Sequence, residues 1–151
     1  MLRHNHGGTV RRTLAVRRVS RGQALAEFAL VLPIFVLLLF GLIDVGRVVY
    51  INNAAAQAAR EGARWGSVQG RSVDAAGRAS VRDYTLGTMN AVPNPSVTVT
   101  CERNNTAISR CRTNDILVVT VQSPVSMITP LVERVFGSVN VSATSRVVVN
   151  Q

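Results

Sequence analysis

The chain has 151 residues, a formal net charge of +9 and two cysteines, which leaves room for one modest domain and is too little for a multidomain enzyme. All seventeen basic residues are Arg; six of them precede Gly22 with no acid among them, and the other eleven face eight acidic residues, a surplus of +3. The positive charge therefore belongs mainly to the N-terminus, and a nucleic-acid site, which gathers basic residues on the folded part, is not indicated.

An uncharged apolar run follows this basic leader, from Phe28 to Ile43. Its sixteen residues make about 24 Å of helix, and Gln23–Ala26 and Val48–Ile51 extend it to a length that crosses a membrane. Such a run is either a membrane helix or the apolar core of a secretory signal. The preceding positive charges predict a cytoplasmic N-terminus, with everything after about Arg47 outside. Cleavage by an ordinary signal peptidase is the alternative, but its nearest small-residue site, Ala54–Ala56, comes ten residues late.

Acids lie at both ends of the run. Glu27 is about one helical turn from uninterrupted hydrocarbon, where a carboxylate costs up to roughly 2.5–3.5 kcal/mol and is by default a functional-site hypothesis; the alternative is an acid that merely suits the helix dipole. At the other end, Asp44 and Arg47 are three residues apart and can meet on one helix face, or they are two interfacial charges marking the membrane boundary. Pro33 predicts a kink between these ends.

The helical pattern continues beyond the apolar run to about Gly66 as an amphipathic stalk. Its buried face is predicted to hold small and apolar residues at spacings of three or four: Ile51, Ala55, Ala58, Gly62 and Trp65. A second helix is predicted from Ser72 to about Leu86. One side of this second helix carries Val73, Ala76, Ser80 and Tyr84.

The remainder has the pattern of strands. Ser96–Cys101 and Val139–Val149 alternate, whereas Ile116–Val121 is apolar on both faces; Ser123–Gly137 holds two prolines around a short helical turn. We therefore expect an α+β fold, in which a small antiparallel sheet has its middle strand most buried and the stalk laid across one face. The expected organisation is a leader (1–22), a membrane and stalk helix (23–66) and an extracytoplasmic head (67–151).

Cys101 and Cys111 fall on the predicted outer side, where oxidation allows a disulfide. A closed loop of about ten residues contributes roughly 2–3 kcal/mol. A zinc site would need further ligands, and the two histidines, His4 and His6, lie in the leader. Without histidine in the exported part there is no catalytic triad there, and no phosphate loop or metal spacing is present. We therefore expect no enzyme, no cofactor, no metal and no small-molecule substrate.

The stretch from Arg21 to Arg64 resembles the N-terminal signature of the TadE-like proteins of the tight-adherence (Tad, or Flp) pilus system. The likeness is carried by a basic leader, a glycine, four residues, a glutamate and an aromatic before the apolar helix, and by the block AAREGAR. The matching positions include Gly22, Glu27, Phe28, Pro33, Asp44 and Arg47. The segment Pro124–Val149 is more loosely similar to the family's C-terminal end, and the cysteine loop aligns with nothing. The leader is long, which leaves open a later translation start.

The resemblance implies a role in pilus assembly. A prepilin peptidase would cut after Gly22, leave Gln23 as the mature N-terminus and discard the leader, while the helix stays in the cytoplasmic membrane. Glu27, followed by Phe28, would pair with the new α-amino group of a neighbouring subunit. The partners implied are the assembly platform with its ATPase and other pilin subunits, for which the chain would be a minor pilin or pseudopilin. The alternative is an unprocessed single-pass accessory protein whose head scaffolds envelope or secretion components.

Overall fold

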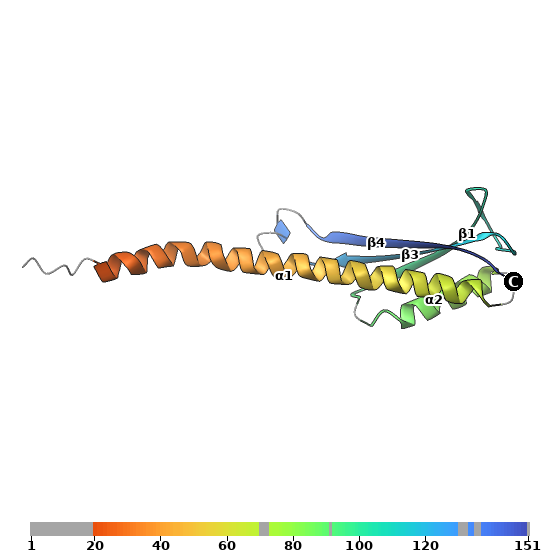
Figure 1. The fold of residues 1–151 in the computed structure, drawn as a ribbon, viewed down its shortest axis with the longest axis horizontal. Helices are drawn as coiled ribbons and strands as arrows, with labels where there is room; N and C mark the ends of the chain where they lie inside the picture. Colours follow the sequence, from red (N-terminus) through yellow and green to blue (C-terminus); the bar gives the residue numbers. More distant parts are fainter. Residues whose placement is uncertain (1–19, 70–72, 91, 130–132, 135–136, 151) are drawn as a thin grey trace, which may run out of the picture. The chain divides into compact units, whose positions relative to one another are not determined.

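The structure is a computed structural model, and it describes residues 20–69, 73–90, 92–129, 133–134 and 137–150. By its internal contacts the chain divides into two units, with the border between Val36 and Leu37. The long helix α1, Ser20–Ser67, contributes residues to both units (Figure 1).

In the first unit α1 is a helix whose large apolar side chains are exposed. Every residue from 22 to 36 is exposed, including Leu30 at 74%. The helix is continuous on both sides of Pro33, and the kink expected there stays a prediction. Among the described residues α1 is the one helix long and apolar enough to cross a membrane.

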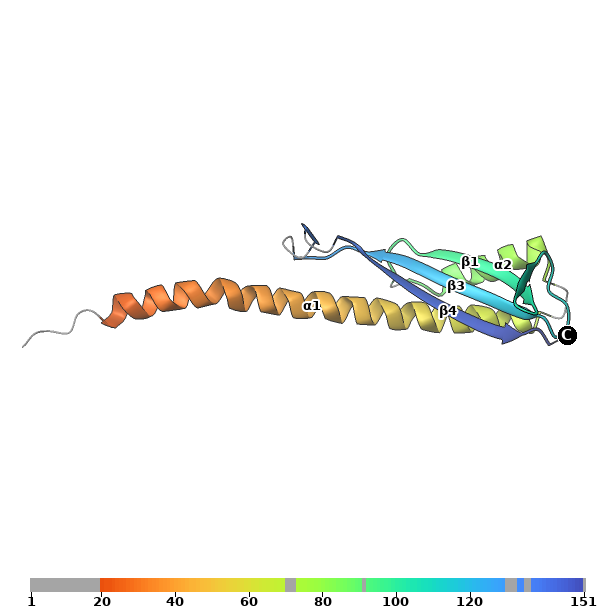
Figure 2. The same ribbon diagram turned by 90° about the horizontal axis from the view of Figure 1, so that it is seen from above.

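The second unit is a small α+β head, as the sequence predicted. Its elements besides the rest of α1 are α2 (Ala75–Gly87), β1 (Ser96–Arg103), β2 (Thr106–Ile108), β3 (Ile116–Val125) and β4 (Val139–Val148). The strands form one sheet in the order β2-β1-β3-β4, antiparallel throughout. Figure 2 shows β3 between β1 and β4, and this central strand is the most buried of the sheet.

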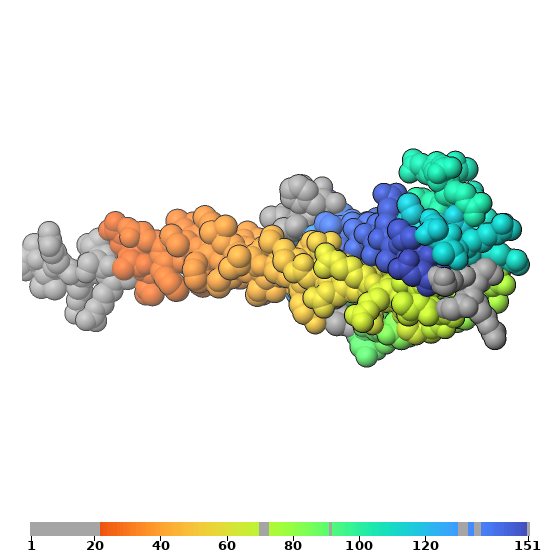
Figure 3. All heavy atoms as spheres, turned by 45° about the vertical axis from the view of Figure 1, so that its right-hand side comes forward, coloured from red at the N-terminus to blue at the C-terminus, as the bar shows by residue number. Residues whose placement is uncertain are grey.

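Small residues on α1 allow the helices and the sheet to approach closely. Figure 3 shows the atoms of this part of α1, in yellow, directly against the blue atoms of the sheet. The buried face of α1 includes Ala55, Ala59 and Ala63, which share one core cluster with the inward residues of α2 and the sheet. A Cβ added to Gly62 would lie 3.1 Å from the Cβ of Thr85 on α2. A Cβ added to Gly66 would lie 2.6 Å from Leu117 Cδ2 on β3. Larger side chains at these two positions would push α2 and β3 away from α1.

Helix α2 begins later than predicted and buries a different face. Asp74 caps it, since its side chain accepts a hydrogen bond of 2.9 Å from the Gly77 N–H. Val73 lies before the cap. The buried residues are Val81 and Thr85, whereas Ala76 and Ser80, which the sequence placed on one side with Val73 and Tyr84, are exposed. The close approach at Gly62 selects the Thr85 face, and the half-buried Tyr84 stacks on Trp65 with ring centroids 4.7 Å apart.

The sheet also contains a hairpin that the sequence analysis missed. β1 runs two residues past Cys101, turns at Asn104 and Asn105, and returns as β2. Both Asn residues have positive φ, 50° and 63°, which suits a two-residue hairpin turn. The Asn-Asn pair was the signal that could have predicted this turn.

The helical turn predicted in Ser123–Gly137 falls partly outside the described residues. β3 extends through Pro124 to Val125. Beyond it, the Glu133 N–H donates to Thr129 O (3.0 Å) and the Gly137 N–H donates to Glu133 O (2.8 Å). This four-residue spacing is that of a helix.

Candidate functional site in helix α1 and the loop that it holds

The predicted cleavage position lies in the first turn of α1. Gly22 and Gln23 are helical and exposed, and a side chain added at Gly22 would meet nothing within 4 Å. The first four N–H groups of a helix have no partner within it, so the terminal turn opens at little cost in free energy. The Gly22–Gln23 bond therefore lies in an exposed turn that can unwind readily.

Glu27 and Phe28 stand on the open surface of the same helix. The Gln23 side-chain amide donates a hydrogen bond of 3.2 Å to Glu27 Oε1, and Phe28 is 62% exposed. Within one chain, Gln23 thus gives the carboxylate a local, solvent-exposed partner. The spacing of four residues is the signal that could have predicted this contact. It occupies one carboxylate oxygen with a neutral donor, and no ion pair to Glu27 is present among the residues that the structure describes.

Asp44 is buried, with 3% of its surface exposed, and binds a loop that is distant in sequence. Its Oδ1 accepts a hydrogen bond from the Ile128 N–H (2.8 Å), and its Oδ2 accepts from the Thr129 N–H (3.0 Å) and Thr129 Oγ1 (2.7 Å). Three donors therefore surround the carboxylate. These hydrogen bonds replace those that the carboxylate would make with water if it were exposed.

Arg47 binds the same loop. Its Nη1 donates to the Ser126 carbonyl oxygen at 3.3 Å, and no ion pair joins Arg47 to Asp44 among the described residues. Asp44 and Arg47 are thus connected by binding the same segment, Ser126–Thr129, which we call the clamp loop. Local spacing along a helix cannot reveal a partner about eighty residues away.

The predicted disulfide between Cys101 and Cys111 is confirmed, with a Cα–Cα distance of 5.3 Å. Both cysteines are buried, at 1% and 0% exposure. Cys111 also forms an antiparallel bridge with Val73, through backbone hydrogen bonds of 3.2 and 3.1 Å. The disulfide therefore joins β1 to the segment before β3 and closes a loop that contains the β1–β2 turn. The backbone bridge ties the same segment to the chain that enters α2.

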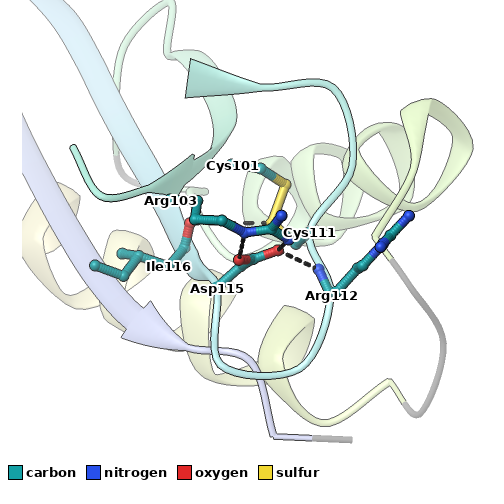
Figure 4. A network of polar contacts seen from close by, with 6 residues as sticks. All are labelled: Cys101, Arg103, Cys111, Arg112, Asp115 and Ile116. Atoms are coloured by element: carbon teal, nitrogen blue, oxygen red, sulfur yellow. Dashed lines mark hydrogen bonds and ion pairs between the residues drawn. A yellow bond between two sulfur atoms is a disulfide. The ribbon is translucent and has the colours of Figure 1, made fainter. Parts of the chain in front are cut away.

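A polar network supports this disulfide region (Figure 4). Arg103 donates to both oxygens of Asp115, at 2.6 and 2.7 Å, and the Arg112 N–H donates to Asp115 at 2.7 Å. The Arg103 hydrogen bonds, then the Arg112 N–H, hold the pKa of Asp115 at about 2, below its ordinary 3.8. The same ion pair raises the pKa of Arg103. The network fixes the turn that leads into β3, and no motif in the sequence marks it.

These features define a class of protein: a small disulfide-bonded α+β head on a helix long and apolar enough to be a membrane anchor. Residues 22–64 match the family model described as TadE-like protein, which confirms the resemblance predicted from the sequence. The match covers α1 from the predicted cleavage position almost to its end, and α2 and the sheet lie outside it. Comparisons with curated proteins and with solved structures gave no match.

Proposed function

We propose that the chain is a prepilin-like component of a Tad/Flp-type pilus assembly system. α1 anchors it in the cytoplasmic membrane, with the N-terminus in the cytoplasm and the head outside. The observation that carries the proposal is the match of residues 22–64 to the TadE-like family on a helix whose large apolar side chains are exposed. An exposed apolar surface of this extent requires lipid or other helices around it. The role is structural and requires no catalysis, cofactor or small-molecule substrate.

Processing is the first step of this proposal. A prepilin peptidase cuts after Gly22, removes the six-arginine leader and leaves Gln23 as the N-terminus. The accessible first turn of α1 supports a cut at this bond. The new α-amino group is a cation at the end of an apolar helix, and it appears only after the cut.

Glu27 then supplies the acceptor for that cation from a neighbouring subunit. Two opposite charges about 4 Å apart gain about 1 kcal/mol in water and several-fold more where water is partly excluded, as in a helix bundle. The exposed carboxylate of Glu27 and the exposed Phe28 ring next to it in sequence suit such a bundle. The charge pair fixes the register between subunits, and the assembly platform and other pilins are the partners.

Substitutions at Glu27 test this assembly role. Glu27→Leu removes a charge from the edge of the apolar run, so insertion and cleavage should continue while filament formation is lost. Glu27→Asp keeps the charge at a worse distance and should retain partial piliation. Glu61→Gln is the matched control, because Glu61 is an exposed acid on α1 outside the apolar run. Filaments are counted by electron microscopy, with membrane levels of each variant measured in parallel.

Two outcomes would contradict the assembly role. Normal piliation by a stable, processed Glu27→Leu variant would show that no pairing is needed. Near-neutral behaviour of Glu27→Gln would assign the acid to the helix dipole, where its contribution is about 0.3–1 kcal/mol of local helix stability.

A further inference from the structure

An apolar groove lies between α1 and the end of the sheet nearest the clamp loop. It measures about 390 Å³ and is lined on α1 by the turns from Gly41 to Val49, and across from them by Met127 and Val139. Apolar side chains around it face outward: Val45 is 61% exposed, Val49 53% and Ile128 52%. The clamp loop therefore contributes Met127 to the groove lining and carries an exposed isoleucine at the next residue.

Asp44 is the one acid among the described residues that line this groove, and hydrogen bonds within the head satisfy both of its oxygens. Both Asp44 oxygens accept from the backbone and hydroxyl of Ile128 and Thr129. A carboxylate bonded in this way can adjoin an apolar medium without an unsatisfied acceptor. The same bonds fix the clamp loop at the level of Asp44 along α1.

That level coincides with the expected edge of the hydrocarbon. A membrane helix needs about twenty apolar residues, and twenty residues counted from Leu25 or from Phe28 end at Asp44 or at Arg47. In the second unit the helix preceding this level exposes only apolar side chains, such as Leu38 at 68% and Leu42 at 70%. Within the second unit, the groove thus continues the apolar surface of α1 on to the loop and β4.

We propose that the clamp loop and this groove bind lipid, forming a second membrane contact made by the head itself. Acyl chains fill the groove, Ile128 enters the hydrocarbon edge, and the guanidinium of Arg47, half-buried and bonded through one nitrogen to Ser126, lies among the headgroup phosphates. The inference rests on the membrane anchoring in the proposed function. Its consequence is that the head is held against the bilayer until it is extracted.

Fluorescent labels on single introduced cysteines test the contact. The full chain is reconstituted in phosphatidylcholine–phosphatidylglycerol vesicles at low protein density, with bimane on Leu38→Cys, Ile128→Cys or Val148→Cys. The native cysteines are joined in a disulfide and do not react. Ile128 contributes only its backbone N–H to Asp44, so the label leaves that bond in place. Val148, 45% exposed on β4, is the matched control outside the groove.

Nitroxide-labelled lipid should quench bimane at residue 128 several-fold more than at residue 148, and iodide in the water should do the reverse. Equal behaviour of residues 128 and 148, with residue 38 quenched by lipid, overturns the inference and leaves the anchor intact. Absence of lipid quenching at residue 38 contradicts the anchor itself. Protection of residue 128 that disappears as the vesicles are diluted with lipid overturns the inference too, because it would show that a second copy of the chain covers the groove.

Discussion

Two stretches of α1 share one helical backbone but have opposite surroundings. From Gly22 to Ile43 the helix is rich in Leu, Ile, Val and Phe, and nearly every side chain is exposed. From Ile51 to Ser67 it is rich in Ala and Gly, and one face is buried against α2 and the sheet. Large side chains suit a helix whose surroundings come from outside the chain, whereas small ones allow the chain's own elements to approach. Side-chain size, more than helix propensity, therefore separates anchor from stalk.

Removing the disulfide should distinguish the two parts of the chain most clearly, because it should destabilise the head and leave the anchor unchanged. Replacing Cys101 and Cys111 together by Ala should lower the free energy of unfolding of the head by about 2–5 kcal/mol, as for native disulfides of small exported domains. Urea denaturation in detergent measures the loss, and recovery of the protein in membranes should not change. Reductant added to the wild type serves as the control. An unchanged urea midpoint would contradict the stabilising role.

A glycine exchange on each stretch tests the comparison directly. Gly62→Ala should destabilise the head by about 1–3 kcal/mol, because the added Cβ crowds Thr85. Gly41→Ala, where nothing lies within 4 Å of the added Cβ, should be neutral or stabilising by up to about 1 kcal/mol through helix propensity. The comparison of the two stretches would fail if both exchanges changed the denaturation midpoint equally.

Asp44 lies at the border between the stretches, and its loss should loosen one loop without unfolding the head. In Asp44→Ala the N–H groups of Ile128 and Thr129 lose their acceptor, so their hydrogen exchange should accelerate while amides of β3 stay protected. Arg47→Ala removes a single, exposed hydrogen bond and should give a smaller acceleration. Unchanged exchange at residues 128 and 129 in Asp44→Ala would show that the clamp loop is held by other contacts.

The smallest expected effect is a pH dependence confined to the head. The pKa of Asp115 is about 2 when folded and 3.8 ordinarily, so the unfolded chain binds the proton more readily. Its contribution is complete above the ordinary pKa and is lost as the pH falls from about 4 through 2. The melting temperature of wild type should exceed that of Asp115→Asn at pH 6, and the difference should shrink towards pH 2. A difference independent of pH would contradict the ion pair with Arg103.

The sequence predicted what depends on pattern and missed what depends on distant partners. The length of the apolar run and the spacing of the alanines predicted α1, and the alternation in the strands predicted the order of the elements that follow. The position of Cys101 and Cys111 on the expected outer side predicted the disulfide. The partner of Asp44 lies about eighty residues away, and the ion pair of Arg103 and Asp115 depends on a turn, so neither has a local signal. The start of α2 was predicted too early because the apolar pattern continues back to Val73, whereas the cap at Asp74 sets the first helical residue at Ala75.

The N-terminus of the protein recovered from native membranes tests the central claim most directly. Intact-mass and peptide mass spectrometry should find a chain that begins at Gln23, and Gly22→Asp should retain the leader. Gly41→Ala is the matched control, since Gly41 is a helical glycine of α1 with no neighbour within 4 Å, and it should be processed normally. A full-length N-terminus in the wild type, or one at Gln57 after the alanine run, would contradict the prepilin account; the first would favour an unprocessed membrane accessory protein.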